Sequence, residues 1–132
     1  MSDGDVAVIQ AVYAAWNDGD IDRMLESIDP EIEWRPGTDS PFAGLHKGID
    51  DYERYVRSWA STFEHVEIEL GEIRPVGDRL MAEQLQRSRM RGSTVDLEAV
   101  VTHVWRVRDG FIAEWFSFRD EQEARAFLER HA

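Results

Sequence analysis

Residues 94–119 decide the fold of this chain, and they read TVDLEAVVTHVWRVRDGFIAEWFSFR. Every second residue from Val95 to Val107 is apolar except His103, which is the alternation of a β-strand with one face turned to the interior. Asp109-Gly110 follows, and this pair supplies the positive φ that a tight hairpin turn requires. The stretch is therefore predicted to form a β-hairpin.

The second strand of this hairpin carries aromatic residues on both faces. Trp115, Ser117 and Arg119 alternate on one face, and the other face holds Ile112, Glu114, Phe116 and Phe118. Aromatic residues on both faces indicate that both are covered. We expect one face to line a pocket and the other to be buried by a helix or by a partner subunit.

The composition fits one domain with an aromatic interior. The chain has 132 residues, enough for a single core, with five Trp, six Phe and three Tyr to fill that core or line a concave site. Cysteine is absent, which excludes disulfides, a thiolate nucleophile and a cysteine-ligated metal. The sequence also lacks paired-histidine spacing, an EF-hand loop and a dinucleotide or phosphate-binding loop. No metal and no cofactor are expected.

The charge limits the class of partner. A formal net charge of −12 argues against nucleic acid and anionic membranes, because both are polyanions. The N-terminus is acidic and lacks a signal-peptide pattern, and no apolar run is long enough to span a membrane, so a cytoplasmic protein is expected. Arg87, Arg89 and Arg91 alternate along one stretch, and we interpret them as an ion-paired strand face rather than an anion-binding site.

The first third of the chain predicts two helices and a strand. Ile9, Tyr13 and Trp16 recur at helical spacing before a stop at Asp18-Gly19. Asp20 is expected to cap a second helix with a buried stripe that extends to Ile28, and Pro30 to end it. Residues 31–35 then alternate as a short strand.

The remainder predicts one further helix, a meander of strands and a final helix. A loop from Pro36 to Gly48 leads into a helix that runs to about Glu64. Strands follow over residues 66–76, with a bulge at Gly71, and over residues 79–91. The sequence leaves open which face of the 79–91 strand turns inward. Asp120 is expected to cap the last helix.

Three segments of this order resemble the nuclear transport factor 2-like superfamily, and within it the SnoaL-like domains related to polyketide cyclases and ketosteroid isomerases. The segments are AAWNDGDIDRMLESIDPEIEWRPG at 14–37, GLHKG at 44–48 and HVWRVRDGFIAEW at 103–115. The resemblance implies an α+β fold over residues 1–132, a cone-shaped curved antiparallel sheet covered by N-terminal helices, also described as a cystatin-like α+β barrel. It also implies a homodimer through the outer sheet face, with Val100, Val104, Phe116 and Phe118 facing the partner or another cover.

The same resemblance implies a conical pocket for a small apolar organic molecule. The residues predicted to bind this ligand are Tyr13, Trp16, Trp34, Trp59, Phe63, Gln86, Trp105, Trp115, Ser117 and Arg119. Arg119 would stand at the pocket mouth and hold an anionic group, or it is simply a solvated arginine at a strand end. Arg35 and Asp39 are placed at the rim by the same reasoning.

His103 is the candidate catalytic residue, because imidazole titrates near neutral pH and can act as general acid or base. The alternative is a core histidine whose hydrogen bonds are satisfied within the protein. In the related ketosteroid isomerases an aspartic acid aligned with His103 donates to the developing oxyanion. Their base position falls here at Arg35 or Pro36, and their tyrosine position at Val12, so that activity is not expected.

Two functions remain open at this level. The first is an isomerase, cyclase or dehydratase that works by acid/base chemistry through His103. The second is a non-catalytic ligand-binding or interaction module of the same fold, in which His103 is structural. Asp120 is a further carboxylate of interest, although a helix cap is the simpler interpretation.

Overall fold

The computed structural model describes residues 3–37 and 42–131, so Asp39 lies outside the described residues. The first elements are α1 (Asp3–Asn17), α2 (Ile21–Leu25), β1 (Ile28–Arg35), β2 (His46–Lys47) and α3 (Ile49–Thr62). They are followed by β3 (Phe63–Leu70), β4 (Arg74–Val76), β5 (Arg79–Met90), β6 (Leu97–Arg108), β7 (Phe111–Phe118) and α4 (Glu121–Arg130). The predicted α+β order of elements is confirmed.

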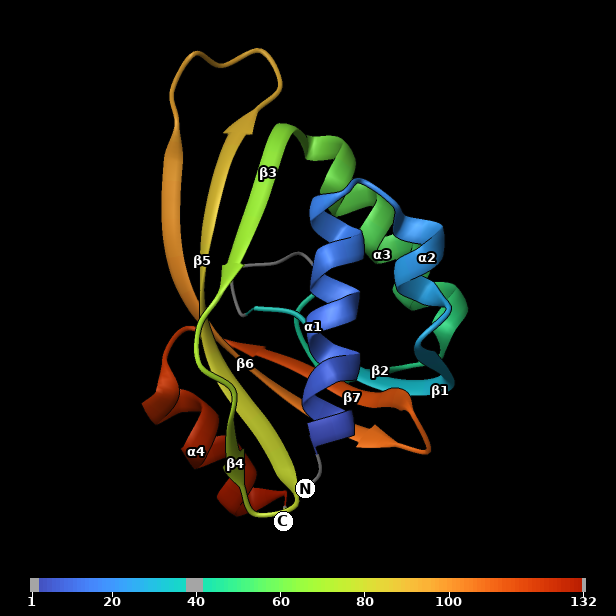
Figure 1. The fold of residues 1–132 in the computed structure, drawn as a ribbon. Helices are drawn as coiled ribbons and strands as arrows, with labels where there is room; N and C mark the ends of the chain where they lie inside the picture. Colours follow the sequence, from blue (N-terminus) through green and yellow to red (C-terminus); the bar gives the residue numbers. More distant parts are fainter. Residues whose placement is uncertain (1–2, 38–41, 132) are drawn as a thin grey trace.

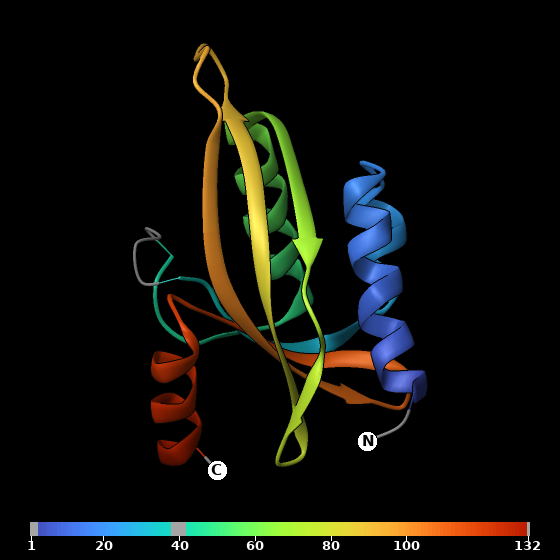
Figure 2. The same cartoon turned by 60° about the vertical axis from the view of Figure 1, so that its left-hand side comes forward.

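The strands form one curved, mostly antiparallel sheet in the order β2-β1-β7-β6-β5-β3, with β4 paired to β5 (Figure 1). The exception is β1, which runs parallel to β7. The sheet has the predicted curved and mostly antiparallel form, with one parallel pair of strands. Helices α1, α2 and α3 cover one side of the sheet and α4 covers the other, as the two views show (Figures 1 and 2).

The predicted hairpin is confirmed in its turn and its faces. Asp109 and Gly110 have φ angles of 55° and 83°, the positive values of a tight hairpin turn. Across β6 and β7, His103 pairs with Ser117 and Val104 with Phe116. Because side chains alternate along a strand, this register sends His103 and Ser117 to the concave side, toward α1 and α3.

The convex face of the hairpin is buried by the chain's own last helix. Met81, Val104, Phe116 and Phe118 form a cluster with α4, which contributes Ala124, Phe127 and Leu128. A helix or a partner subunit was expected to cover this face, and the structure shows that the helix α4 covers these residues. Val100 lies outside this cluster and is 58 % exposed. The homodimer through the outer sheet face stays a prediction. Of the four residues expected to face the partner, only Val100 is exposed in the single chain.

Two predicted boundaries were wrong. Helix α2 ends at Leu25, and Ile28, expected on its buried stripe, instead begins β1 opposite Ile112. A single apolar residue at helical spacing fits a strand equally well, and Pro30 is tolerated because the β1–β7 register shifts between Ile28 and Glu33. Likewise α3 ends at Thr62, and Phe63 is extended, with φ −107° and ψ 142°.

Other local predictions hold. Asp20 and Asp120 cap their helices by accepting hydrogen bonds from the backbone N–H groups of Arg23 (3.0 Å) and Glu123 (2.9 Å). Two members of the predicted arginine row are ion-paired on the outer face of β5: Arg87 lies 3.1 Å from Glu98 and Arg89 lies 2.8 Å from Asp96. Arg91 lies beyond the end of β5 and donates to the backbone oxygen of Ser61 at 2.7 Å. No helix within residues 3–37 and 42–131 is long and apolar enough to cross a membrane.

The role of α4 as the cover of the hairpin predicts a specific loss of stability. Phe127 is 8 % exposed and packs on Phe116 and Phe118 at ring-centroid distances of 5.3 Å. Phe127→Ala is expected to lower the free energy of unfolding by about 3 kcal/mol, measured by denaturant titration. The matched control is Phe111→Ala, which removes the same atoms from a residue that is 42 % exposed and should cost less than about 1 kcal/mol. Equal losses for the two variants would contradict the assignment.

Candidate functional site

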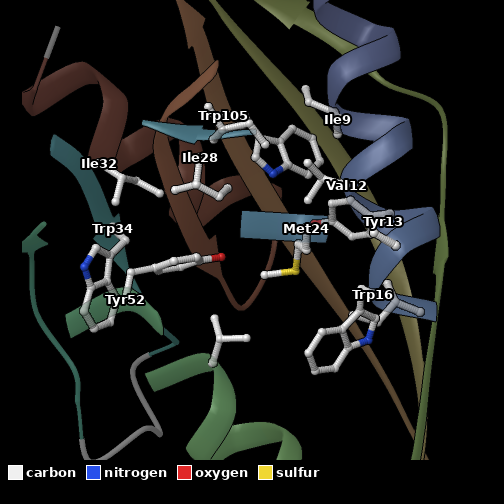
Figure 3. Close-up of a cluster of buried hydrophobic side chains, with 14 of the residues drawn as sticks. Ile9, Val12, Tyr13, Trp16, Met24, Ile28, Ile32, Trp34, Tyr52 and Trp105 are labelled. Atoms are coloured by element: carbon white, nitrogen blue, oxygen red, sulfur yellow. The ribbon is translucent and has the colours of Figure 1, made fainter. Parts of the chain in front are cut away.

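A cavity of about 790 Å³ lies between the concave face of the sheet and the helices. Its wall includes all the predicted ligand-binding residues except Trp105, namely Tyr13, Trp16, Trp34, Trp59, Phe63, Gln86, Trp115, Ser117 and Arg119, together with His103. Several of them belong to the main hydrophobic cluster, where Tyr13, Trp16, Trp34 and Tyr52 converge from α1, β1 and α3 (Figure 3). The structure thus brings residues from distant parts of the chain to one apolar, aromatic site.

Trp105 lies behind this wall rather than on it. Its side chain is fully buried, in the same cluster as Ile9 and Val12 of α1 (Figure 3). The rings of Tyr13 and Trp115 pack against it at centroid distances of 5.8 and 6.4 Å. The alternation of β6 correctly gives the face of Trp105, but the two rings in front of it separate it from the cavity. Trp105 supports the position of Tyr13 and Trp115.

His103 is held at the cavity wall by a buried hydrogen-bond network. The indole Nε1–H of Trp115 donates to His103 Nδ1 at 2.7 Å. The hydroxyl of Tyr13 lies 2.9 Å from the same nitrogen and 2.6 Å from Oε1 of Gln84, to which it donates. These contacts join α1, β5, β6 and β7, so the position of the imidazole depends on the whole concave face.

The network fixes the tautomer of His103. An indole nitrogen is a donor only, so Trp115 requires an unprotonated Nδ1, and the proton of the neutral imidazole must sit on Nε2. Burial acts in the same direction: it disfavours the charged form and lowers the pKa of His103 from 6.5 to about 3. The pKa of Tyr13 is raised well above 10.0, mainly by burial, so its hydroxyl keeps its proton. His103 is therefore neutral at physiological pH and presents an Nε2–H group.

That Nε2–H group is free to meet a ligand. Among the described residues none hydrogen-bonds to Nε2, and this nitrogen is not one of the fully enclosed polar atoms that lack a partner. It therefore keeps some solvent contact, and His103 lines the cavity. The prediction that His103 faces the pocket and the alternative that it is bonded within the protein are both partly met: Nδ1 is satisfied internally, while Nε2 is available.

The cavity wall holds neutral polar groups and, among the described residues, no carboxylate. Trp16, Trp34 and Gln84 line it, and each holds a buried side-chain N–H group without a partner among the described residues. None of the aspartate or glutamate residues in residues 3–37 and 42–131 contributes to the wall. These three N–H groups are fully enclosed by the protein, which distinguishes them from the Nε2–H group of His103.

Several wall residues were not predicted from the sequence. Gln84 is fully buried and completes the network with Tyr13, and Tyr52 and Tyr55 reach the cavity from α3. The signal for Gln84 is its alternation with Leu80 and Ala82, which are both buried on the same face of β5. The sequence leaves that face undecided because both faces of β5 mix polar and apolar residues. The structure turns the even-numbered residues inward.

The rim combines two arginines in different environments. The side chain of Arg119 is 74 % exposed and lies 3.3 Å from a carboxylate oxygen of Glu123, whereas that of Arg35 is only 15 % exposed. Asp120 is a helix cap, as described above, and does not line the cavity. Within the described part of the chain, no group of three or more histidine, aspartate or glutamate side chains is arranged to hold a metal ion.

Comparisons with known proteins agree with this architecture. TerC, crystallised with polyporic acid, is 21 % identical with a TM-score of 0.75, and 96 % of each chain is covered. A nuclear transport factor 2-like protein from Burkholderia thailandensis is 25 % identical with a TM-score of 0.74, covering 97 % of this chain and 98 % of that one. A protein of unknown function with a cystatin-like fold from Xanthomonas campestris is 21 % identical with a TM-score of 0.74, covering 92 % and 95 %.

These structural likenesses confirm the predicted fold. No functionally curated protein matches the chain in sequence. The SnoaL-like domain family matches residues 9–115, which is most of the chain. The protein therefore belongs to the SnoaL-like domain family and has the nuclear transport factor 2-like, cystatin-like fold.

Proposed function

We propose that this protein binds a small, largely apolar organic molecule in the aromatic cavity, with the Nε2–H group of His103 donating a hydrogen bond to an oxygen of the ligand. The observation that carries the proposal is the 2.7 Å bond from Trp115 to Nδ1, which fixes the tautomer and leaves Nε2–H as the group available to the cavity. A buried donor aimed into an apolar cavity selects a ligand with an acceptor at that point.

The size and the aromatic lining of the cavity support the same proposal. A cavity of about 790 Å³ is of the size that small organic ligands occupy. TerC, which shares the fold, was crystallised with polyporic acid. A ligand with an apolar body and an oxygen acceptor matches the aromatic lining and the Nε2–H group of His103.

Catalysis by polarising a substrate oxygen is the second candidate, and the fixed orientation of the Nε2–H group favours it. A neutral imidazole with a pKa of about 3 is a poor general base at neutral pH, but it can donate to an oxygen on which negative charge develops. Isomerisation, cyclisation and dehydration all include such an oxygen. The wall of described residues offers no carboxylate base, so His103 would act as the donor in these reactions.

Ligand binding is testable with paired probes. Wild-type protein is expected to bind 4-acetylbiphenyl about tenfold more tightly than 4-ethylbiphenyl, measured by quenching of tryptophan fluorescence, because the ketone accepts from Nε2–H. His103→Asn keeps an acceptor at the place of Nδ1 for Trp115 but has no atom at the place of Nε2, so the preference should disappear. His103→Gln, which reaches the place of Nε2, should retain part of it. Failure of both probes to bind the wild type would refute the proposal.

The low pKa of His103 predicts a pH dependence of stability. The unfolded chain takes up a proton at His103 below pH 6.5, whereas the folded protein does so only near pH 3, so the free energy of unfolding falls as pH decreases through this range. The limiting slope for one such group is about 1.4 kcal/mol per pH unit. The unfolding free energy of the wild type minus that of His103→Asn should therefore decrease as the pH is lowered from 6.5 toward 3, measured by denaturant titration at a series of pH values. The exposed-histidine control, His65→Asn, should leave the wild-type slope at these pH values largely in place.

The second candidate predicts hydrogen exchange at carbon next to a polarised carbonyl. In D₂O the methyl hydrogens of bound 4-acetylbiphenyl are lost to solvent base as the carbonyl oxygen gains negative charge. The wild type should accelerate this exchange by about tenfold or more over His103→Asn at equal occupancy of the cavity, followed by NMR. Equal rates for the two proteins, with binding intact, would leave ligand binding as the function and remove the catalytic candidate.

A further inference from the structure

The hydroxyl group of Tyr52 is a polar group on the helical side of the cavity. Tyr52 lies on α3, is 5 % exposed and lines the cavity. Its ring packs against the rings of Trp34 and Trp115 at centroid distances of 5.6 and 5.8 Å, and these contacts hold it in place. Figure 3 shows its oxygen directed from α3 toward the middle of the aromatic cluster, on the side of Met24, which lines the same cavity.

This hydroxyl has no hydrogen-bond partner within residues 3–37 and 42–131. Its oxygen is also absent from the fully enclosed polar atoms of these residues that lack a partner, so it keeps some solvent contact. The hydroxyl of Tyr13 differs, because it donates to Gln84 at 2.6 Å and lies 2.9 Å from Nδ1 of His103. Of these two buried hydroxyls, that of Tyr52 is the one available to a ligand.

Tyr52 and His103 border the same part of the cavity. Both rings contact the ring of Trp115, at centroid distances of 5.8 Å for Tyr52 and 5.9 Å for His103. The pKa of Tyr13 is raised by burial and further by the charge of Tyr52, so these two hydroxyls lie within electrostatic range of each other. Burial raises the pKa of Tyr52 itself well above 10.0, so at neutral pH its hydroxyl keeps its proton and can both donate and accept.

Tyr55 is the other tyrosine that α3 contributes to the wall, and it lies farther out. Its ring packs on Trp34 at 5.0 Å and on Phe42 at 5.6 Å, and Phe42 is 43 % exposed. Tyr52 packs instead on Trp115, next to His103. The geometry therefore favours Tyr52 over Tyr55 as a group that acts on the same ligand as His103.

We infer that the hydroxyl of Tyr52 is a second polar contact of the ligand, and that the ligand class is an apolar molecule with two separate oxygens, one that accepts from Nε2–H of His103 and one hydroxyl that pairs with Tyr52. This inference rests on the proposed function, because it assigns a second group of the same ligand. A hydroxyl suits Tyr52 because a tyrosine hydroxyl both donates and accepts, whereas Nε2–H only donates.

A packing role for Tyr52 is the competing explanation. Its ring contacts with Trp34 and Trp115 would then be its whole contribution. In that case removal of the hydroxyl would not change the preference between ligands with and without a second oxygen. Tyr52→Phe separates the two roles, because it keeps the ring and removes only the oxygen.

The probes are 4-acetylbiphenyl and its three derivatives with a hydroxyl at carbon 2, 3′ or 4′, which place the second oxygen at increasing distance from the ketone. They are titrated into the full-length protein with tryptophan fluorescence as the readout. The wild type is expected to bind at least one derivative about fivefold more tightly than 4-acetylbiphenyl. Tyr52→Phe should bind that derivative no more tightly than 4-acetylbiphenyl, because the ligand hydroxyl leaves water without gaining a partner.

Two controls show whether a change is specific to the second oxygen. Tyr52→Phe should keep the preference for 4-acetylbiphenyl over 4-ethylbiphenyl, which depends on His103. Ser61→Ala removes from α3 an exposed hydroxyl that donates to the backbone oxygen of Ser58 at 2.7 Å and does not line the cavity. It should change each affinity by less than about twofold.

The possible outcomes separate the inference from the proposed function. If no derivative binds the wild type more tightly than 4-acetylbiphenyl, or if Tyr52→Phe keeps the hydroxyl preference, the second contact is wrong while the ligand site stands. If Tyr55→Phe removes the preference and Tyr52→Phe does not, the hydroxyl pairs with Tyr55 and the inference is likewise overturned. If neither 4-acetylbiphenyl nor any derivative binds, the proposed function fails together with it.

Thermal unfolding without ligand tests whether the hydroxyl is unused by the protein. Tyr52→Phe should keep the midpoint of unfolding within about 2 °C of the wild type or raise it, because no bond within the protein is lost. Tyr13→Phe, the matched comparison, breaks the bond to Gln84 and should lower the midpoint by more than that. A fall for Tyr52→Phe as large as for Tyr13→Phe, or a failure to fold, would show a hydroxyl bonded within the protein and would overturn the inference.

Discussion

The hydrogen bond from Trp115 to Nδ1 of His103 is the interaction on which the chemistry of this site depends. It is 2.7 Å long and joins neighbouring strands of the hairpin. The donor is an indole, which cannot accept, so the bond exists only with a neutral imidazole protonated on Nε2. The register of β6 and β7, which pairs Trp105 with Trp115 and His103 with Ser117, puts the two side chains within reach.

This bond needs a buried environment, and the two sides of the sheet supply it. On the concave side the hydroxyl of Tyr13 lies 2.9 Å from Nδ1 of His103 and donates to Gln84. On the convex side α4 covers Phe116 and Phe118, which lie between and beside the residues of the site along β7. Because α4 of the same chain buries this face, close packing within one chain holds the hairpin in place. A rigid hairpin keeps the Nε2–H group directed at the cavity.

Charge is distributed unevenly between the inner and outer ends of the cavity. The inner part presents the neutral Nε2–H group of His103, and the rim includes Arg119, whose side chain is 74 % exposed and ion-paired with Glu123. No aspartate or glutamate among the described residues lines the cavity, and on the outer face of β5 the carboxylates of Glu98 and Asp96 pair with Arg87 and Arg89. A ligand with an apolar body and an oxygen acceptor near His103 matches this arrangement better than a uniformly apolar one.

The fold class, the hairpin and its turn, the helix caps and part of the cavity wall were predictable from the sequence. These features depend on neighbours in the chain: Asp109-Gly110 sets its own φ angles, and alternation along β6 decides which residues share a face with His103. The resemblance to SnoaL-like domains then supplied the arrangement of the elements. Phe63 was placed in the wall correctly, although in a helix rather than in β3.

Only the tertiary structure decided the parallel pairing of β1, the burial of the convex face by α4, the withdrawal of Trp105 behind Tyr13 and Trp115, and the protonation state of His103. Each of these depends on residues far apart in the sequence; Tyr13 and His103, for example, are separated by 90 positions. The pKa of His103 is lowered by burial, and its tautomer is set by the donor that contacts Nδ1. Neither can be inferred from the alternation of residues along β6. The sequence by itself determined that an imidazole faces the cavity, and the packing around it determined that it does so as a neutral donor.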